Sequence, residues 1–219
     1  MKNLFLFFLT LALFSSCQSS HKSSYLSPAF EKARAYDKTL AILPFEVVNR
    51  YKRMPKGSTI ESLKSIEKED AIIMQRDLYR YCLRAYSNNE YTVYLQNYSK
   101  TNEILEAKGI KYEDIKKIPK EELAEMLGVD AVVSGKVRQV KGKWTGGIIS
   151  HYIGVLFGRG KKLNATLAIY NRENDRPIWK YNDGVSVSEE DTVLSLSRKL
   201  LRTVSQKIPY QTDMGRVTR

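Results

Sequence analysis

Histidine and cysteine are scarce in this sequence: the 219 residues include only two of each. The histidines are His21 and His151, which belong to two different parts of the chain. A Ser-His-Asp triad, a Cys-His pair or a metal site built from several histidines cannot be assembled from so few side chains. We therefore expect no histidine-based catalysis, no metal site and no cofactor.

The usual sequence signals for nucleotide binding are also missing. Gly158 to Lys162 reads GRGKK, but a phosphate-binding loop would need glycine at Val155 and serine or threonine at Lys162. Carboxylates cluster at 121–122 and 189–191, which are predicted helix starts, where the helix dipole accounts for them. An enzyme with a carboxylate site stays open as an alternative. It would require a cleft lined by carboxylates of raised pKa.

Long apolar runs are absent except at the start of the chain. Met1-Lys2-Asn3 is a short basic leader, and the run from Leu4 to Phe14 is about half the ~20 residues that a membrane-spanning helix needs. Small side chains at Ser15 and Ser16 precede Cys17. The segment 13–17 resembles a bacterial lipoprotein signal, which implies that Cys17 is acylated and becomes the mature N-terminus. Ordinary secretion and an uncleaved anchor remain the alternatives.

The second cysteine, Cys82, has no intrachain partner if Cys17 carries lipid, in a compartment that oxidises thiols. Ala71, Met74, Leu78, Cys82 and Ala85 recur at helical spacing within the predicted helix 65–86. We therefore expect Cys82 to be a buried apolar side chain of that helix rather than a reactive thiol.

The formal charge of +12 at pH 7 indicates affinity for anionic surfaces. Basic clusters occur at 50–53, 136–143 and 159–162. An exported protein rarely meets nucleic acid, so we expect no nucleic-acid partner. The clusters are then either a solvated basic surface or a surface attracted to anionic components of the envelope.

The stretch Glu121 to Val140 has the clearest pattern. A short helix follows Pro119 and ends at Gly128, because glycine adopts the left-handed conformation without a side-chain clash. From Asp130 the apolar period changes to that of an interior strand.

The remaining elements alternate. They are a strand at 39–45, a loop at 47–62, the helix at 65–86, a strand at 90–95, a helix at 100–108, a hairpin of strands at 163–170 and 178–187, and a final helix from Ser188 to Ile208 that Pro209 ends. The order predicts an α/β fold with a single domain, one mixed sheet and helices packed on it.

The segment 142–160 holds six glycines among large apolar side chains. Glycine at this density opposes a regular helix, and the apolar content opposes a solvated loop. It is either a hairpin folded onto the domain's own core or a surface that contacts a partner or a membrane. The predicted contact residues are Trp144, Ile153, Leu156, Phe157, Arg159, Lys161 and Lys162.

The segments LAILPF (40–45), LGVDAVVSGKV (127–137), LNATLAIYN (163–171) and PIWKY (177–181), the last followed by a helix, resemble the CsgG-like bacterial lipoproteins, a group that includes LpoB. The resemblance covers about Leu40 to Ile208 and implies a fold similar to the N-terminal domain of TolB. It also implies an envelope lipoprotein whose partner is another protein.

These observations predict four regions: a signal peptide at 1–16, a lipidated cysteine and flexible tether at 17–37, an α/β domain at 38–210 and a frayed tail at 211–219. We expect a non-enzymatic outer-membrane lipoprotein, facing the periplasm, that binds or scaffolds another envelope protein. Self-association stays open. A subunit of a secretion channel is the main alternative, although neither 47–62 nor 144–157 has the alternating pattern of a lipid-facing strand.

Overall fold

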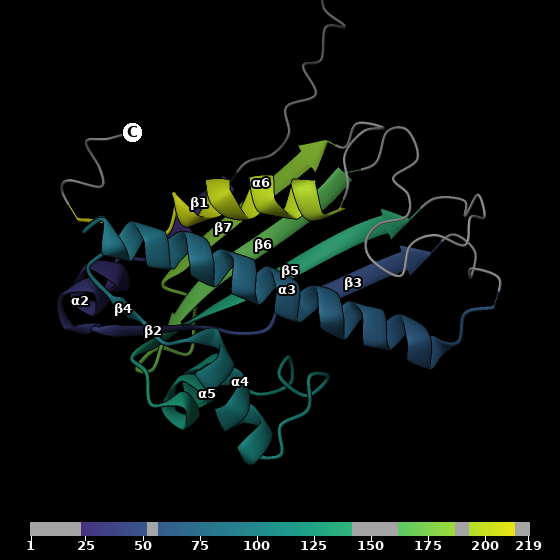
Figure 1. Ribbon diagram of the computed structural model, residues 1–219. Helices are drawn as coiled ribbons and strands as arrows, with labels where there is room; N and C mark the ends of the chain where they lie inside the picture. The colour runs from purple at the N-terminus through teal and green to yellow at the C-terminus, as the bar shows by residue number, and fades with distance from the viewer. Residues whose placement is uncertain (1–22, 52–56, 142–161, 187–192, 213–219) are drawn as a thin grey trace, which may run out of the picture.

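A computed structural model describes residues 23–51, 57–141, 162–186 and 193–212, and the account below is confined to them (Figure 1). Their strands form one seven-stranded sheet in the order β1-β7-β6-β5-β2-β4, with β3 also paired to β5. The strands are β1 (Ser23–Leu26), β2 (Thr39–Ile42), β3 (Glu46–Tyr51), β4 (Tyr94–Leu95), β5 (Ala131–Lys141), β6 (Lys162–Asn171) and β7 (Trp179–Ser186). β2 and β3 run parallel to β5, whereas β5, β6, β7 and β1 are successively antiparallel. The sheet is mixed, as the sequence predicts.

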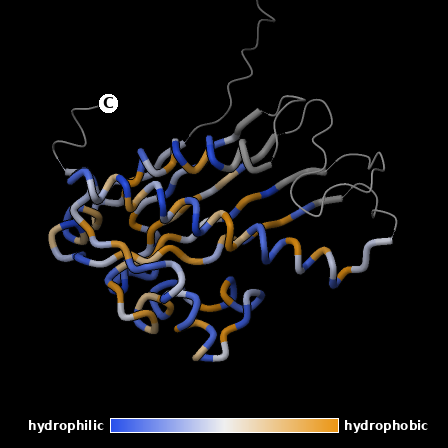
Figure 2. The backbone as a smooth tube through the Cα atoms, viewed as in Figure 1, coloured by the Kyte–Doolittle hydropathy of each residue, from blue (hydrophilic) through white to orange (hydrophobic). Residues whose placement is uncertain are grey.

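Helices pack on both faces of this sheet (Figure 1). They are α2 (Ala29–Tyr36), α3 (Ile60–Ser87), α4 (Tyr98–Ala107), α5 (Lys120–Leu127) and α6 (Val193–Ser205). The larger apolar cluster joins α2, α3 and α6 to one sheet face, and a smaller cluster joins α4 and α5 to the other. Figure 2 shows hydrophobic residues gathered along the strands that these helices cover. The predicted fold class, a single α/β domain, is confirmed.

The segment that opens the chain differs from the prediction. Ser23 to Leu26 form β1, which pairs antiparallel with β7, and α2 follows directly. Phe30 of α2 is buried in the larger apolar cluster. Residues 23–37 therefore belong to the domain and not to a tether, because one aromatic side chain and one strand pairing hold a segment whose composition is mainly polar.

The predicted loop 47–62 is also corrected. Its first part is β3, a strand parallel to β5, and its last part is the start of α3, where Thr59 and Ser62 form a capping box. β3 continues the line of β2 after a bulge, since Leu43, Pro44 and Phe45 lie opposite only two residues of β5. Its polar residues hid it from a reading based on hydrophobicity, because backbone pairing with β5 and the bond at 2.9 Å from the Asn49 N–H to Glu67 Oε1 of α3 hold it in place.

The α5-to-β5 connection follows the prediction. α5 ends at Gly128, whose φ of 67° and ψ of 35° are left-handed. The Gly128 N–H donates to Glu125 O at 3.0 Å, and the Val129 N–H donates to Ala124 O at 3.0 Å. Glycine adopts this conformation without the clash that a Cβ would cause, so the chain turns at once into β5.

The predicted hairpin is confirmed as β6 and β7, paired from Lys162↔Ser186 to Ile169↔Trp179. The predicted final helix is observed as α6, and Leu200, Leu201, Val204 and Ile208 on it and just after it are buried. Gln211 and Thr212, predicted to belong to the frayed tail, are held in the domain, because Gln211 forms a bridge with Tyr91 and the Thr212 N–H donates to Glu90 O at 2.8 Å. The predicted start of the final helix at Ser188 lies outside the described residues.

Cys82 lies on the buried side of α3, as predicted, and burial raises the pKa of its thiol to about 12. The predicted strand 90–95 shortens to β4, although Tyr91 makes a separate bridge to Gln211. The predicted helix at 100–108 is observed as α4, and Gly109 after it has a φ of 71°.

Candidate protein-binding surface

The sheet face that carries α4 and α5 is covered only in part. Alternation along the strands places Ala41 and Val132 beneath these helices. Further along the same face, Arg138, Asn164 and Lys180 are exposed. We call this region the open sheet face. Its described members are Glu46, Val48, Ser134, Lys136, Arg138, Asn164, Thr166, Ala168, Lys180 and Asn182.

A hollow of about 460 Å³ lies where the open sheet face meets the segment between α4 and α5. Tyr112 is its best anchored lining residue. Its hydroxyl donates to Phe45 O at 3.0 Å and accepts from the Val47 N–H at 3.1 Å, so it ties this segment to the bulge between β2 and β3. Burial raises the pKa of the Tyr112 hydroxyl, and the nearby Glu67 and Glu46 act in the same direction.

Lysines and carboxylates share the lining of the hollow. Lys136 Nζ lies 2.7 Å from Glu46 Oε1, which joins β5 to β3. Lys120 Nζ donates to Ile115 O at 2.6 Å and to Ile118 O at 2.9 Å. Burial lowers the pKa of Lys120. These charged groups already have partners within the protein. They form a polar surface above the paired strands β3 and β5.

Thr166 and Asn182 extend the surface toward the sheet edge. The Thr166 hydroxyl and Asn182 Oδ1 are 2.7 Å apart across β6 and β7, and Asn182 Nδ2 lies 3.0 Å from Ser23 Oγ of β1. Side chains that are hydrogen-bonded in a row along one face lose little further freedom when a partner packs on them. The surface can therefore contact another protein without rearrangement.

A second hollow, of about 300 Å³, is lined by Asp37 and Asp130 together with residues of α2 and of the turn between β6 and β7. Asp37 is only 3% exposed. Its carboxylate accepts hydrogen bonds from the Tyr210 hydroxyl and from Asn171 Nδ2. These bonds join the end of α2, the end of β6 and the C-terminal segment.

Burial, with a smaller contribution from the charge of Asp130, raises the pKa of Asp37 to about 6, although the hydrogen bond from Tyr210 acts in the opposite direction. Burial acts in the same direction on Asp130, but its pKa is lowered, because the Lys38 N–H, the Thr39 N–H and the Thr39 hydroxyl all donate to Oδ2. A carboxylate of raised pKa is what the enzyme alternative requires. Both carboxylate oxygens of Asp37 accept hydrogen bonds from the protein itself, which favours a structural role for this side chain.

The predicted contact residues Trp144, Ile153, Leu156, Phe157, Arg159 and Lys161 lie outside the described residues, as does Cys17. Lys162 is the first residue of β6, and its backbone pairs with Ser186. The open sheet face is not among the sites predicted from the sequence. The alternation of side chains in 163–170 does indicate such a face, since it places Asn164, Thr166, Ala168 and Tyr170 on the same side of the strand.

No helix within the described ranges is long and apolar enough to cross a membrane. Over the same ranges, no group of three or more His, Cys, Asp or Glu side chains is arranged to hold a metal ion.

No protein-family model matches the sequence, and no curated protein sequence matches it. Solved structures give weak matches. The chain is similar to the lipoprotein GNA1162 from Neisseria meningitidis, with 13% identity and a TM-score of 0.42 over 78% of this chain and 97% of that one. It is similar to a PelC dodecamer subunit from Paraburkholderia phytofirmans, with 14% identity and a TM-score of 0.41 over 85% and 94%.

A third similarity is to the C-terminal domain of LpoB from Escherichia coli, with 14% identity and a TM-score of 0.31 over 73% of this chain and 94% of that domain.

Proposed function

We propose that this protein is a non-enzymatic lipoprotein of the bacterial envelope that binds another envelope protein through the open sheet face. Acylated Cys17 anchors it to the outer membrane, and the domain faces the periplasm. The leader at 1–16 supports the anchor, and the open sheet face supports the binding role.

The single observation that carries the binding role is that one face of the sheet combines a hollow with an exposed polar surface. α4 and α5 cover the neighbouring part of the same sheet face. The exposed area is therefore confined to the open sheet face. A protein interface needs a rigid patch with hydrogen-bonding groups and some apolar area. Val48, Tyr112 and Pro177 supply the apolar part of this surface, and Lys136, Thr166 and Lys180 supply the polar part.

Site-directed photocrosslinking in the host tests the binding role. A photoreactive amino acid at Lys180 or Thr166, on the open sheet face, should give an adduct with a defined envelope protein. The same probe at Lys108, beyond the end of α4, is the matched exposed control. Adducts that form from Lys108 and not from the open sheet face would refute the assignment of this surface.

A charge-reversal pair then tests whether the contact matters. Lys180→Glu should weaken capture of that partner while the melting temperature stays unchanged, because Lys180 is exposed. Lys108→Glu should leave capture intact. Equal capture by both variants would show that the open sheet face is not the contact.

The anchor is tested separately by Cys17→Ala. The wild-type protein should fractionate with membranes and carry the mass of an acylated mature chain. Two or three acyl chains hold a protein firmly, since each buried CH₂ contributes ~0.8 kcal/mol. The variant should appear in the soluble fraction or remain unprocessed. A variant that keeps the mature mass and stays membrane-bound would refute lipidation at this residue.

A further inference from the structure

α3 and α6 together build a basic surface from two distant parts of the sequence. Arg76, Arg80 and Arg84 recur at four-residue spacing on the second half of α3. Arg198, Lys199, Arg202 and Lys207 lie on α6 and just after it, and all four are exposed. We call these seven residues the α3–α6 basic face.

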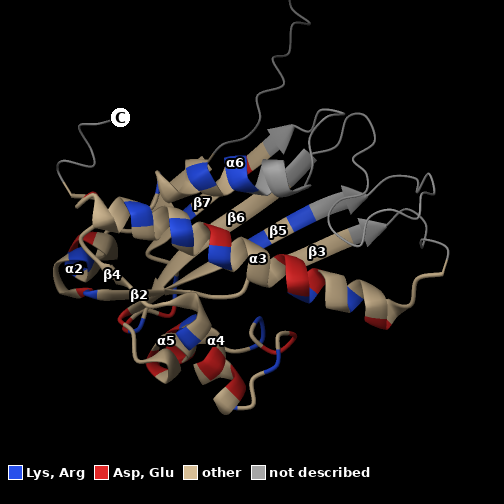
Figure 3. Cartoon of the chain, viewed as in Figure 1, with Lys and Arg blue, Asp and Glu red and all other residues tan. Residues whose placement is uncertain are grey.

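Little negative charge opposes this face. Residues 198–207 contain no acidic side chain, and residues 76–87 contain only Asp77, which is buried and lies 3.5 Å from Arg76. Figure 3 shows the basic residues on α6 and the second half of α3, whereas acidic residues concentrate on the first half of α3 and on α4 and α5. The net charge of the chain is therefore distributed unevenly over the described surface.

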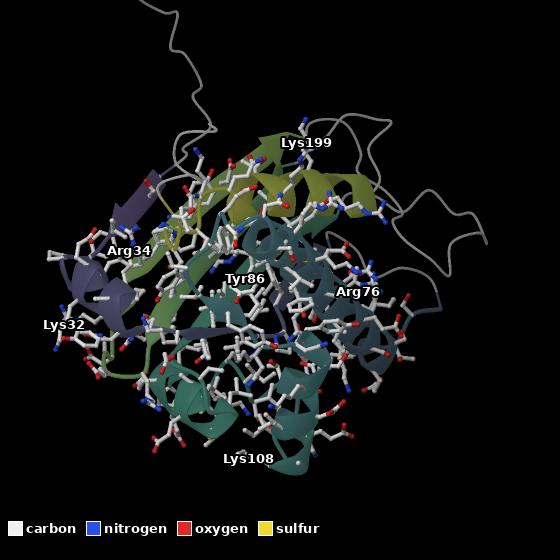
Figure 4. The ribbon with its side chains drawn as sticks, turned by 60° about the vertical axis from the view of Figure 1, so that its left-hand side comes forward. Lys32, Arg34, Arg76, Tyr86, Lys108 and Lys199 are labelled. Carbon is white, nitrogen blue, oxygen red and sulfur yellow. The ribbon has the colours of Figure 1, made fainter. Side chains whose placement is uncertain are left out.

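The two helices also form a shallow concavity of about 420 Å³, lined by Tyr81, Arg198, Lys199, Arg202, Thr203 and Gln206. Lys199 and Lys108 lie at opposite ends of the molecule (Figure 4). A ligand that covers the basic face would therefore leave the region of α4 free.

The start of the described domain places this face close to the proposed anchor. Only six residue steps separate Cys17 from Ser23, the first residue of β1, and such a segment spans at most about 20 Å. β1 lies at the sheet edge against β7, and α6 packs on β7 (Figure 1). Within β1, Leu26 pairs with Trp179, whose side chain lies on the sheet face that α6 covers, and Leu26 is 48% exposed.

We propose that the α3–α6 basic face rests on a membrane surface of anionic phospholipid headgroups. The inference relies on the proposed acyl anchor at Cys17, which would hold β1 and α6 close to the bilayer. Lysine and arginine side chains are attracted to the negative surface potential of such a membrane, and an exposed leucine such as Leu26 can enter its apolar boundary. In this orientation the α4 end of the molecule points away from the membrane.

A phospholipid surface suits this face better than a nucleic acid does, because the exposed apolar side chain of Leu26 lies beside the short connection to the anchor. A nucleic acid would be attracted by charge alone. The two ligands therefore give different results when they are tested side by side.

The test uses the mature-length chain, residues 17–219, with Cys17→Ala, so that binding is measured without an acyl chain. The protein is sedimented with vesicles of phosphatidylcholine alone or of phosphatidylcholine mixed with phosphatidylglycerol, at low and at high salt. We expect binding to the mixed vesicles only, and weaker binding at high salt, where charges are screened. Failure of lipidation at Cys17 in the host would not alter this measurement, so the two proposals fail separately.

The combined variant Arg198→Ala, Lys199→Ala and Arg202→Ala should reduce the affinity for mixed vesicles by about 100-fold, since each basic residue near an anionic surface contributes about fivefold. The control variant Lys100→Ala, Lys108→Ala and Lys111→Ala removes the same charge from exposed positions around α4. It should bind like the parent chain. Circular dichroism melting checks that both variants are folded.

Three results would overturn the proposal. They are equal binding to neutral and mixed vesicles, an equal loss of binding in the two triple variants, and tighter binding to an oligonucleotide than to mixed vesicles at the same phosphate concentration. The last result would identify the basic face as a general polyanion site.

Discussion

Replacing Asp37 with asparagine should remove a pH dependence of stability that this one buried carboxylate produces. Burial raises its pKa from 3.8 to about 6 in the folded chain. The folded state therefore favours the neutral form, so the contribution of Asp37 to stability is full below pH 3.8. It declines as pH rises and is lost above pH 6.

The magnitude follows from the two pKa values. Each unit of difference corresponds to about 1.4 kcal/mol, so the full effect is about 3 kcal/mol. Between pH 7 and pH 5 the linkage relation assigns Asp37 about 1 kcal/mol of added stability. For a domain of this size that corresponds to a rise of about 3 °C in melting temperature.

Differential scanning calorimetry of the wild type and of Asp37→Asn at pH 5 and pH 7 measures this effect. The wild type should gain about 3 °C relative to the variant on going to pH 5, because asparagine keeps the shape and cannot lose a proton. Asp175→Asn, at an exposed position in the turn before β7, is the control. A difference between wild type and Asp37→Asn that does not change with pH would refute the assignment of a raised pKa to this carboxylate.

Two further predictions concern glycines. Gly128→Val should lower the free energy of unfolding by about 1 to 2 kcal/mol, because the φ of 67° at this position is left-handed. Gly128→Asn should cause a smaller loss. Urea titration of both variants measures the two losses, and equal losses would contradict a left-handed helix end at Gly128. A Cβ at position 135 would overlap the ring of Phe45, so Gly135→Ala should cost about 1 to 3 kcal/mol. Phe45→Leu introduced together with it should relieve part of that loss in the same titration, and strictly additive losses would show that the two side chains do not compete for space.

Most of the regular elements could be predicted because their signals are local. The apolar period around α3, the glycine after α5 and the alternation in β6 each depend on residues within a few positions of one another. The same local signals failed for β1 and β3. Their polar side chains resemble those of a loop, and they become strands only because β7 and β5 offer unpaired backbone groups beside them.

The candidate sites were harder to predict for the same reason. Asp37, Asp130, Asn171 and Tyr210 are spread over most of the chain, and no spacing in the sequence indicates that they meet. The open sheet face depends on where α4 and α5 stop covering the sheet, which is a matter of packing.

The sequence by itself determined the alternation of helices and strands, the α/β class and the excess of positive charge. These properties follow from composition and from contacts between near neighbours. Only the tertiary structure decided which sheet face stays open and where the charge gathers. Arginines of α3 and basic residues of α6 are more than 100 positions apart, and they form one surface because both helices bury their apolar stripes against the same side of the sheet.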